Sequence, residues 1–215
     1  MPELRALIDG FRRFRTGPYR EQRLRYDELA LGQAPDVMVI ACSDSRVDPT
    51  RVFDTAPGQM FVVRNIANLV PPMAAIHGQS SVAAALEYAV EVLRVHYIVV
   101  FGHARCGGIA AALAPLPENR FISAWVEQIA PARATVLAAA RISPDIDCQA
   151  ALEQAGVRLS LANLRTYPFV AAAEAEGRLK LAGALFDIAH GDLRLLDPAT
   201  GRFAEVPVAL GPPRG

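Results

Sequence analysis

The stretch that decides the fold is VMVIACSDSRVDP, residues 37–49, in which an apolar segment runs directly into a group of polar side chains. The apolar residues predict a buried strand over about Asp36–Ala41. Cys42, Asp44 and Arg46 follow at once. A loop has no packing need for a thiol, a carboxylate and a guanidinium, so this set indicates chemistry at the end of the strand.

Composition and charge exclude several classes of protein. The chain has 215 residues, of which 52% are apolar, enough for one domain with a sizeable core. Its 22 basic and 22 acidic residues balance, which argues against nucleic acid or an anionic membrane as a partner. We find no signal peptide and no apolar run of the roughly 18 residues that span a bilayer, so we expect a cytoplasmic protein. In that compartment the 3 cysteines are expected to be thiols or metal ligands.

Strands and helices alternate along the rest of the chain. Further strands are expected at Met60–Val63, within HYIVVFGHARCGG, and as a hairpin within RLKLAGALFDIAHGDLRLLDP. Helices are expected at 80–94, after Gly107, and over 121–140 and 148–165. We therefore expect one α/β domain over residues 1–215, with an N-terminal helical arm (1–31) and a C-terminal tail (198–215). Its mainly parallel sheet has the order 2-1-3-4 with an antiparallel edge strand, and helices flank it.

A second polar cluster, GHARCGG at residues 102–108, follows the third strand. In a sheet of this order the first and third strands are neighbours, so Cys42 lies beside His103 and Cys106 although about sixty residues separate them. Two thiols and one imidazole form a zinc set, and three protein ligands with an open fourth position are typical of a catalytic site. Cys148 lies within a predicted helix, and we do not assign it as a ligand.

The polar neighbours of this set suit a catalytic zinc. Asp44 can accept a hydrogen bond from a zinc-bound water, and Arg46 can orient Asp44 and keep it ionised. Taken singly, a cysteine often only packs in the core, and the Asp44–Arg46 pair could be an exposed salt bridge. A thiol phosphatase is a further alternative, but its arginine follows the cysteine by six residues, and here the spacing is four.

The motifs ACSDSRV and GHARCGG, with FVVRNIANLVPP between them, closely resemble the β-class carbonic anhydrases, and similarity extends from about Gly32 to Asp197. The resemblance implies zinc-dependent, reversible hydration of CO2 to bicarbonate and a proton by zinc-bound hydroxide. It implies Cys42, His103 and Cys106 as zinc ligands, and Asp44 with Arg46 as the catalytic dyad. It also implies a homodimer or a higher homo-oligomer such as a tetramer, with active sites near the interface and the N-terminal helices around the partner.

The family has two versions of the site. In one version a Gln, a Phe and a Tyr line the substrate pocket, and this chain has Gln33, Phe61 and Tyr88 at the matching places. We add the backbone N–H of Gly107 or Gly108, at a helix start, as a donor to the forming bicarbonate. On sequence alone, Phe61 and Tyr88 could equally belong to the core.

The other version has a Trp three residues before the first zinc ligand, which helps to form an inhibitory bicarbonate pocket. Val39 stands there in this chain, so Arg64, which can take part in that pocket, lacks its partner. The chain therefore resembles the version with an accessible zinc site. Two rival functions remain open at this point: hydrolysis of another heterocumulene (COS or CS2) at the same site, and non-catalytic zinc binding.

Overall fold

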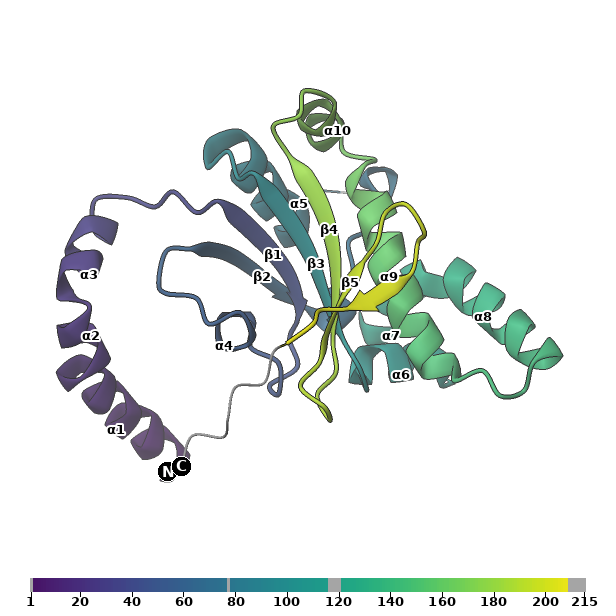
Figure 1. Cartoon of the computed structure of the whole chain (residues 1–215), viewed down its shortest axis with the longest axis horizontal. Helices are drawn as coiled ribbons and strands as arrows, with labels where there is room; N and C mark the ends of the chain where they lie inside the picture. The colour runs from purple at the N-terminus through teal and green to yellow at the C-terminus, as the bar shows by residue number, and fades with distance from the viewer. Residues whose placement is uncertain (1, 77, 116–120, 209–215) are drawn as a thin grey trace.

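A six-stranded sheet forms the centre of the protein in the computed structural model, which describes residues 2–76, 78–115 and 121–208 (Figure 1). The strands run in the order β2-β1-β3-β4-β5-β6. Their bounds are β1 Val37–Cys42, β2 Met60–Asn65, β3 Tyr97–His103, β4 Lys180–Phe186, β5 Leu193–Leu196 and β6 Phe203–Glu205. The first four strands in this order are parallel, and β5 and β6 are antiparallel to their neighbours.

This topology confirms the predicted 2-1-3-4 order and the antiparallel hairpin of β4 and β5. One strand was not predicted, because β6 lies within the segment 198–215 that was expected to be a tail. Only three residues form β6, and so short a segment carries no alternating pattern that would reveal it. Residues 209–215 of the expected tail lie outside the described residues.

Helices follow the strands along the chain. Ahead of the sheet lie α1 Pro2–Thr16, α2 Pro18–Glu21 and α3 Arg23–Leu29. Within and after the sheet lie α4 Pro49–Val52, α5 Ser81–Glu87, α6 Gly107–Leu113, α7 Phe121–Val126, α8 Ala130–Ile142, α9 Cys148–Leu164 and α10 Pro168–Ala175. Shorter 3₁₀ turns lie at Ile66–Asn68, Met73–Ala75 and Glu127–Ile129, and a π-helical turn lies at Tyr88–Val92.

Two of the predicted helices are interrupted. The segment 121–140 forms α7 and α8 with a 3₁₀ turn between them, because Pro131 lacks the N–H that a continuous helix would use. The segment 80–94 forms α5 and then widens into the π-helical turn at Tyr88–Val92. Such turns often accompany functional positions, and Tyr88 begins this one.

The long helix α9 packs tightly against the middle of the sheet. A Cβ atom added to Gly102 in β3 would lie 2.8 Å from Val157 of α9, and one added to Gly183 in β4 would lie 2.9 Å from the same side chain. Only glycine allows this close approach. The contact brings the N-terminal half of α9 beside the loop that follows β3 (Figure 1).

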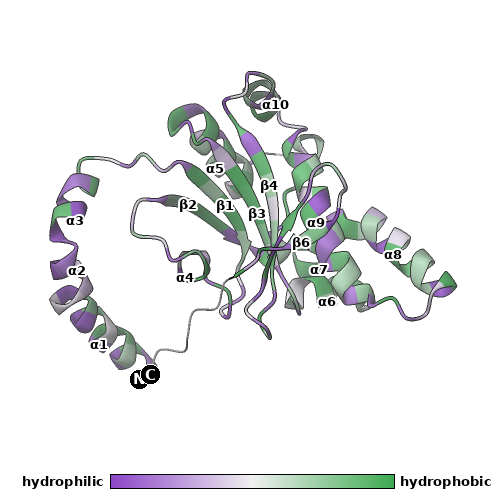
Figure 2. Ribbon diagram, in the orientation of Figure 1, coloured by the Kyte–Doolittle hydropathy of each residue, from purple (hydrophilic) through white to green (hydrophobic). Residues whose placement is uncertain are grey.

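The N-terminal arm stands apart from the sheet (Figure 1). None of the residues of α1 is buried, although its apolar side chains recur at helical spacing. The large exposed apolar side chains of α1 are Leu4, Leu7, Ile8, Phe11 and Phe14. Figure 2 shows these hydrophobic positions mixed with hydrophilic ones along the arm, whereas β1 and β3 are hydrophobic throughout most of their length.

Candidate metal centre

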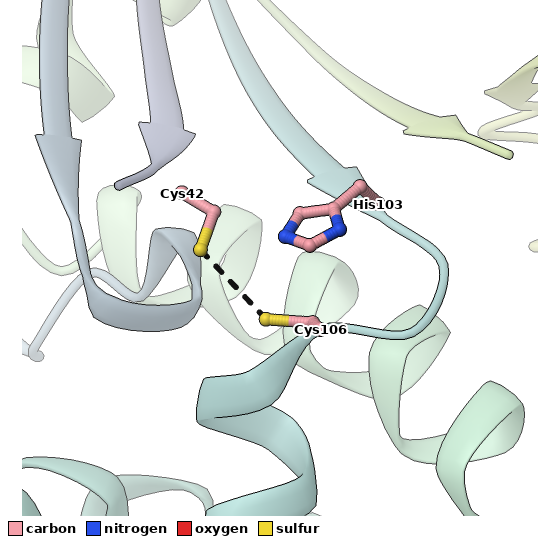
Figure 3. A group of neighbouring side chains, drawn as sticks. All are labelled: Cys42, His103 and Cys106. Carbon is pink, nitrogen blue, oxygen red and sulfur yellow. Dashed lines mark hydrogen bonds between the residues drawn. The ribbon is translucent and has the colours of Figure 1, made fainter. Parts of the chain in front are cut away.

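The ends of two neighbouring strands bring a thiol and an imidazole together, as predicted. Cys42 is the last residue of β1, His103 is the last residue of β3, and the two strands are parallel neighbours. Cys106 lies in the loop after His103 and immediately precedes α6. All three side chains are buried and point toward one another (Figure 3).

The geometry of this cluster fits a tetrahedral zinc ion. The two sulfur atoms, of Cys42 and Cys106, lie 3.8 Å apart, and all three potential ligand atoms lie within 4.8 Å of one another. A tetrahedral zinc with zinc–sulfur bonds of about 2.3 Å holds two sulfur ligands about 3.8 Å apart. Among the residues that the structure describes, no fourth His, Cys, Asp or Glu joins this group, so one coordination position would stay open.

The imidazole of His103 is prepared to bind a metal through one nitrogen. Its Nδ1 lies 2.9 Å from the carbonyl oxygen of Ala104, which can only accept, so Nδ1 carries the proton. The other nitrogen, Nε2, is buried and has no hydrogen-bond partner among the residues that the structure describes. A buried nitrogen with a free lone pair is costly unless something binds it, and a metal ion at this position would do so.

The environment of the two thiols also favours the ionisation that metal binding requires. The hydrogen bond between the two sulfur atoms lowers the pKa of Cys42 and raises that of Cys106. His103 adds to the lowering at Cys42. One thiolate therefore forms readily inside the cluster, and a bound metal ion would favour the second.

Asp44 and Arg46 form a bidentate pair at the edge of the cluster. Oδ1 of Asp44 accepts from Nε of Arg46 at 2.9 Å, and Oδ2 accepts from Nη2 at 2.7 Å. Arg46 holds the pKa of this carboxyl well below its usual range, so Asp44 stays ionised. Oδ2 lies 3.7 Å from Nε2 of His103, and Arg46 also donates to the carbonyl of Arg105. The pair thus connects the two ligand loops at the edge of the cluster.

Arg64 binds the backbone of the loop that follows β1. Its Nε donates to the carbonyl of Cys42 at 3.0 Å, and its Nη2 donates to the carbonyls of Asp44 and Val47 at 2.7 and 2.8 Å. Position 39, where the inhibited version has Trp, is a fully buried core valine. Arg64 therefore holds the backbone of the Asp44 loop. Sequence reasoning missed this role of Arg64 because every residue has a backbone carbonyl, so the sequence does not reveal which carbonyls an arginine binds.

Comparison with known proteins agrees with this geometry. The family described as "Carbonic anhydrase" matches residues 37–193. A carbonic anhydrase of Pseudomonas aeruginosa is 41% identical over 205 residues, covering 94% of this chain and 92% of that protein. The solved structure of the β-carbonic anhydrase CcaA is 29% identical, with a TM-score of 0.90 over 97% of this chain and 94% of that one. This chain belongs to the β-class carbonic anhydrases.

Other members of the class are also similar to this carbonic anhydrase. Beta carbonic anhydrase 3 of Arabidopsis thaliana is 38% identical over 192 residues, covering 86% of this chain and 74% of that protein. One of two tetrameric β-carbonic anhydrases from the ascomycete Sordaria macrospora is 29% identical, with a TM-score of 0.82 over 91% of this chain and 98% of that one. In the described part of this carbonic anhydrase, no helix is both long and apolar enough to cross a membrane.

The expected pocket residues of this carbonic anhydrase lie away from its own cluster. Phe61 pairs with Met38, four residues before Cys42, which corresponds to about 13 Å along a strand. Tyr88 lies beside Phe61, with ring centroids 5.9 Å apart, and it is 43% exposed. Gln33 is exposed in the segment between α3 and β1. A single chain does not bring these three residues to its metal centre.

Gly107, in contrast, lies at the cluster. It is the first residue of α6, directly after Cys106. A Cβ atom added here would meet nothing within 4 Å, so the space beside its Cα atom is open. Two polar side chains of α9, Gln149 and Glu153, also reach the cluster, and the sequence reasoning did not identify them. Polar residues on a predicted helix ordinarily face solvent, and only the packing of α9 shows otherwise.

Proposed function

We propose that this carbonic anhydrase holds a zinc ion with Cys42, His103 and Cys106 and catalyses the reversible hydration of CO2 to bicarbonate and a proton. The observation that carries the proposal is the convergence of two buried sulfur atoms, 3.8 Å apart, and one imidazole nitrogen within 4.8 Å of them that has no hydrogen-bond partner among the described residues. A borderline-soft ion such as zinc suits this donor set. The two thiol ligands must stay reduced, which suits the cytoplasm.

The residues around the cluster support the reaction. When bound, zinc lowers the pKa of a water so that a nucleophile is available near neutral pH. Ionised Asp44 accepts the hydrogen bond of the attacking oxygen and so directs its lone pair toward CO2. Arg46 holds Asp44 in this orientation through two hydrogen bonds. The N–H of Gly107 donates to the bicarbonate oxygen on which charge develops.

A second copy of the chain completes the pocket in this proposal. Phe61 lies too far along the sheet to reach the metal centre of its own chain, Tyr88 packs beside Phe61, and Gln33 precedes the opposite end of β1 from Cys42. The exposed Tyr88 and the apolar side chains of α1 are surfaces that a partner would cover. The protein is therefore proposed to be a homo-oligomer whose minimal unit is a dimer, and relatives from Sordaria macrospora are described as tetramers.

The arm is open to a direct test. We expect the double substitution Leu7→Asp and Phe11→Asp to yield monomers in sedimentation velocity, because these side chains are 73% and 61% exposed in the single chain and would be buried by a partner. CO2 hydration should fall with the loss of the partner's pocket residues. Ile142→Asp, a substitution of another exposed apolar residue outside the arm, serves as the control. An intact oligomer in the double variant would contradict the proposal.

The activity itself is tested by stopped-flow hydration of CO2 between pH 6 and 9, with zinc measured on the same sample. We expect about one zinc per chain and a rate that rises with pH. The thiolates of Cys42 and Cys106 would offset the charge of the metal, so the pKa of a water on it would be higher than beside neutral ligands alone. Arg46 keeps Asp44 ionised throughout this range, so Asp44 does not cause the rise. A flat profile would contradict this assignment.

The same experiment separates the rival functions. Zinc with negligible CO2 turnover but with hydrolysis of COS or CS2 would assign the site to another heterocumulene. Zinc with no turnover of any of the three substrates would indicate a non-catalytic zinc protein. The intact Asp44–Arg46 pair argues against the second outcome, because a zinc site without a reaction has no need of an oriented, ionised carboxylate beside its open position.

A further inference from the structure

Both backbone polar groups of Cys106 are held by side chains of α9. The N–H of Cys106 donates to Oε1 of Glu153 at 2.9 Å. Nε2 of Gln149 lies 3.4 Å from the carbonyl oxygen of Cys106 and donates to the same Glu153 oxygen at 3.0 Å. Gln149 and Glu153 are one helical turn apart, so they face the same side of α9. Together they hold Cys106 from both sides of its Cα atom.

Glu153 is an unusual residue to find at this place. It is 4% exposed, and the cluster around it is mainly apolar. Burying a carboxyl group is costly unless it is hydrogen-bonded. The catalytic roles proposed for Asp44, Arg46 and Gly107 do not involve the carboxyl group of Glu153. A leucine would fill the same space without that cost. Glu153 accepts one hydrogen bond from the N–H of Cys106 and one from the side chain of Gln149. A leucine could make neither of them.

The consequence of this contact concerns the sulfur atom. The carbonyl oxygen of Cys106 also accepts from the N–H of Ala110 at 2.9 Å, at the start of α6. Among the described residues, the N–H of Cys106 donates to Glu153 alone. Three bonds separate its nitrogen from its sulfur. Fixing the N–H therefore fixes the Cα and Cβ atoms, and Sγ can then take only the few staggered positions around the Cα–Cβ bond. Residues that orient metal ligands from behind typically contribute 10- to 100-fold, in round terms, to metal affinity.

We propose that Glu153 is a positioning residue that orients the metal ligand Cys106, with Gln149 supporting its carboxylate. The inference rests on the proposed zinc site, and it adds a residue that touches neither the metal nor the substrate. The role depends on the reach of the side chain to the N–H of Cys106. It does not depend on negative charge, because an amide oxygen accepts the same hydrogen bond.

Two substitutions separate reach from charge. Glu153→Asp keeps the charge but shortens the side chain by one methylene, so it no longer reaches Cys106. Glu153→Gln keeps the reach and the acceptor oxygen but removes the charge. We expect zinc affinity, measured by competition with a chromophoric chelator, to fall about 10- to 100-fold in Glu153→Asp. Glu153→Gln should stay within about threefold of the unchanged protein. Glu176→Asp, the same shortening at an exposed position, is the matched control.

A second readout reports ligand geometry directly. Cobalt bound in place of zinc gives sulfur-to-metal charge-transfer bands and visible bands that depend on tetrahedral geometry. We expect Glu153→Gln to reproduce the bands of the unchanged protein and Glu153→Asp to weaken them. Zinc affinity in Glu153→Asp equal to that of the unchanged protein would overturn the proposal. A loss in Glu153→Gln as large as that in Glu153→Asp would also overturn it, because a side chain that keeps the reach and the acceptor oxygen would then fail to preserve zinc binding.

Two further observations keep the test decisive. If Glu153→Asp does not fold, Gln149→Ala at the half-buried edge of the pair takes its place. It should weaken zinc binding about fivefold, the equivalent of one hydrogen bond, and unchanged affinity would count against the pair. The unchanged protein is measured first. If it binds no zinc, the proposed function fails, which is distinct from normal zinc binding that the variants leave unaltered.

Discussion

Replacing Cys106 by alanine is expected to remove the metal and, with it, CO2 hydration. The substitution leaves two ligands, Cys42 and His103, which are too few to hold zinc against exchange with solvent. Zinc content should fall from about one to below about 0.1 per chain, and turnover should fall at least about 1,000-fold. Metal analysis after dialysis and stopped-flow hydration measure both quantities on one preparation.

The chain offers a matched control for this substitution. Cys148→Ala removes the remaining cysteine, which is half-buried at the start of α9 and does not belong to the metal group. Zinc content and hydration should both stay at the level of the unchanged protein. Full zinc content in Cys106→Ala would show that the ligand set is wrong. Loss of zinc in Cys148→Ala would show that it is incomplete.

Replacing Asp44 by alanine is expected to separate metal binding from catalysis. The Asp44 carboxylate is bound to Arg46 through both oxygens and lies outside the three-residue metal group. Zinc should therefore stay near one per chain. Turnover should fall by about 10²- to 10⁴-fold, the usual contribution of a positioned proton-accepting group, because the attacking oxygen is no longer oriented.

The control for this experiment is Asp145→Ala, which removes an exposed carboxylate from the loop between α8 and α9. It should leave both zinc content and turnover unchanged. Circular dichroism on each variant checks that the fold persists. Full activity in Asp44→Ala would end the assignment of the dyad, whereas loss of zinc together with activity would make Asp44 a metal-supporting residue.

The strands and the ligand set were predictable because the signals are local. Apolar runs mark β1 and β3, and polar groups at their ends mark the switch point between neighbouring parallel strands. That rule was enough to bring Cys42 to His103 and Cys106 from about sixty residues away. The spacing of Asp44 and Arg46 was likewise enough to predict their pairing.

The break between α7 and α8 and the strand β6 were less visible. Pro131 was within the predicted segment, but a proline near a helix start is also compatible with an unbroken first turn. The pairing of β6 with β5 depends on a backbone ladder of three residues, which any sequence of suitable size can form. Pattern reasoning therefore described the centre of the sheet better than its edge.

The sequence by itself determined which chemical groups this protein brings to its metal centre: two thiols, an imidazole and a carboxylate–guanidinium pair. Only the tertiary structure decided what holds them. Arg64 binds three backbone carbonyls, and Glu153 binds a backbone N–H. The physical reason is that every residue but proline offers the same N–H and C=O groups. In a contact between a side chain and the backbone, the sequence therefore identifies the side chain but not the backbone group that it binds.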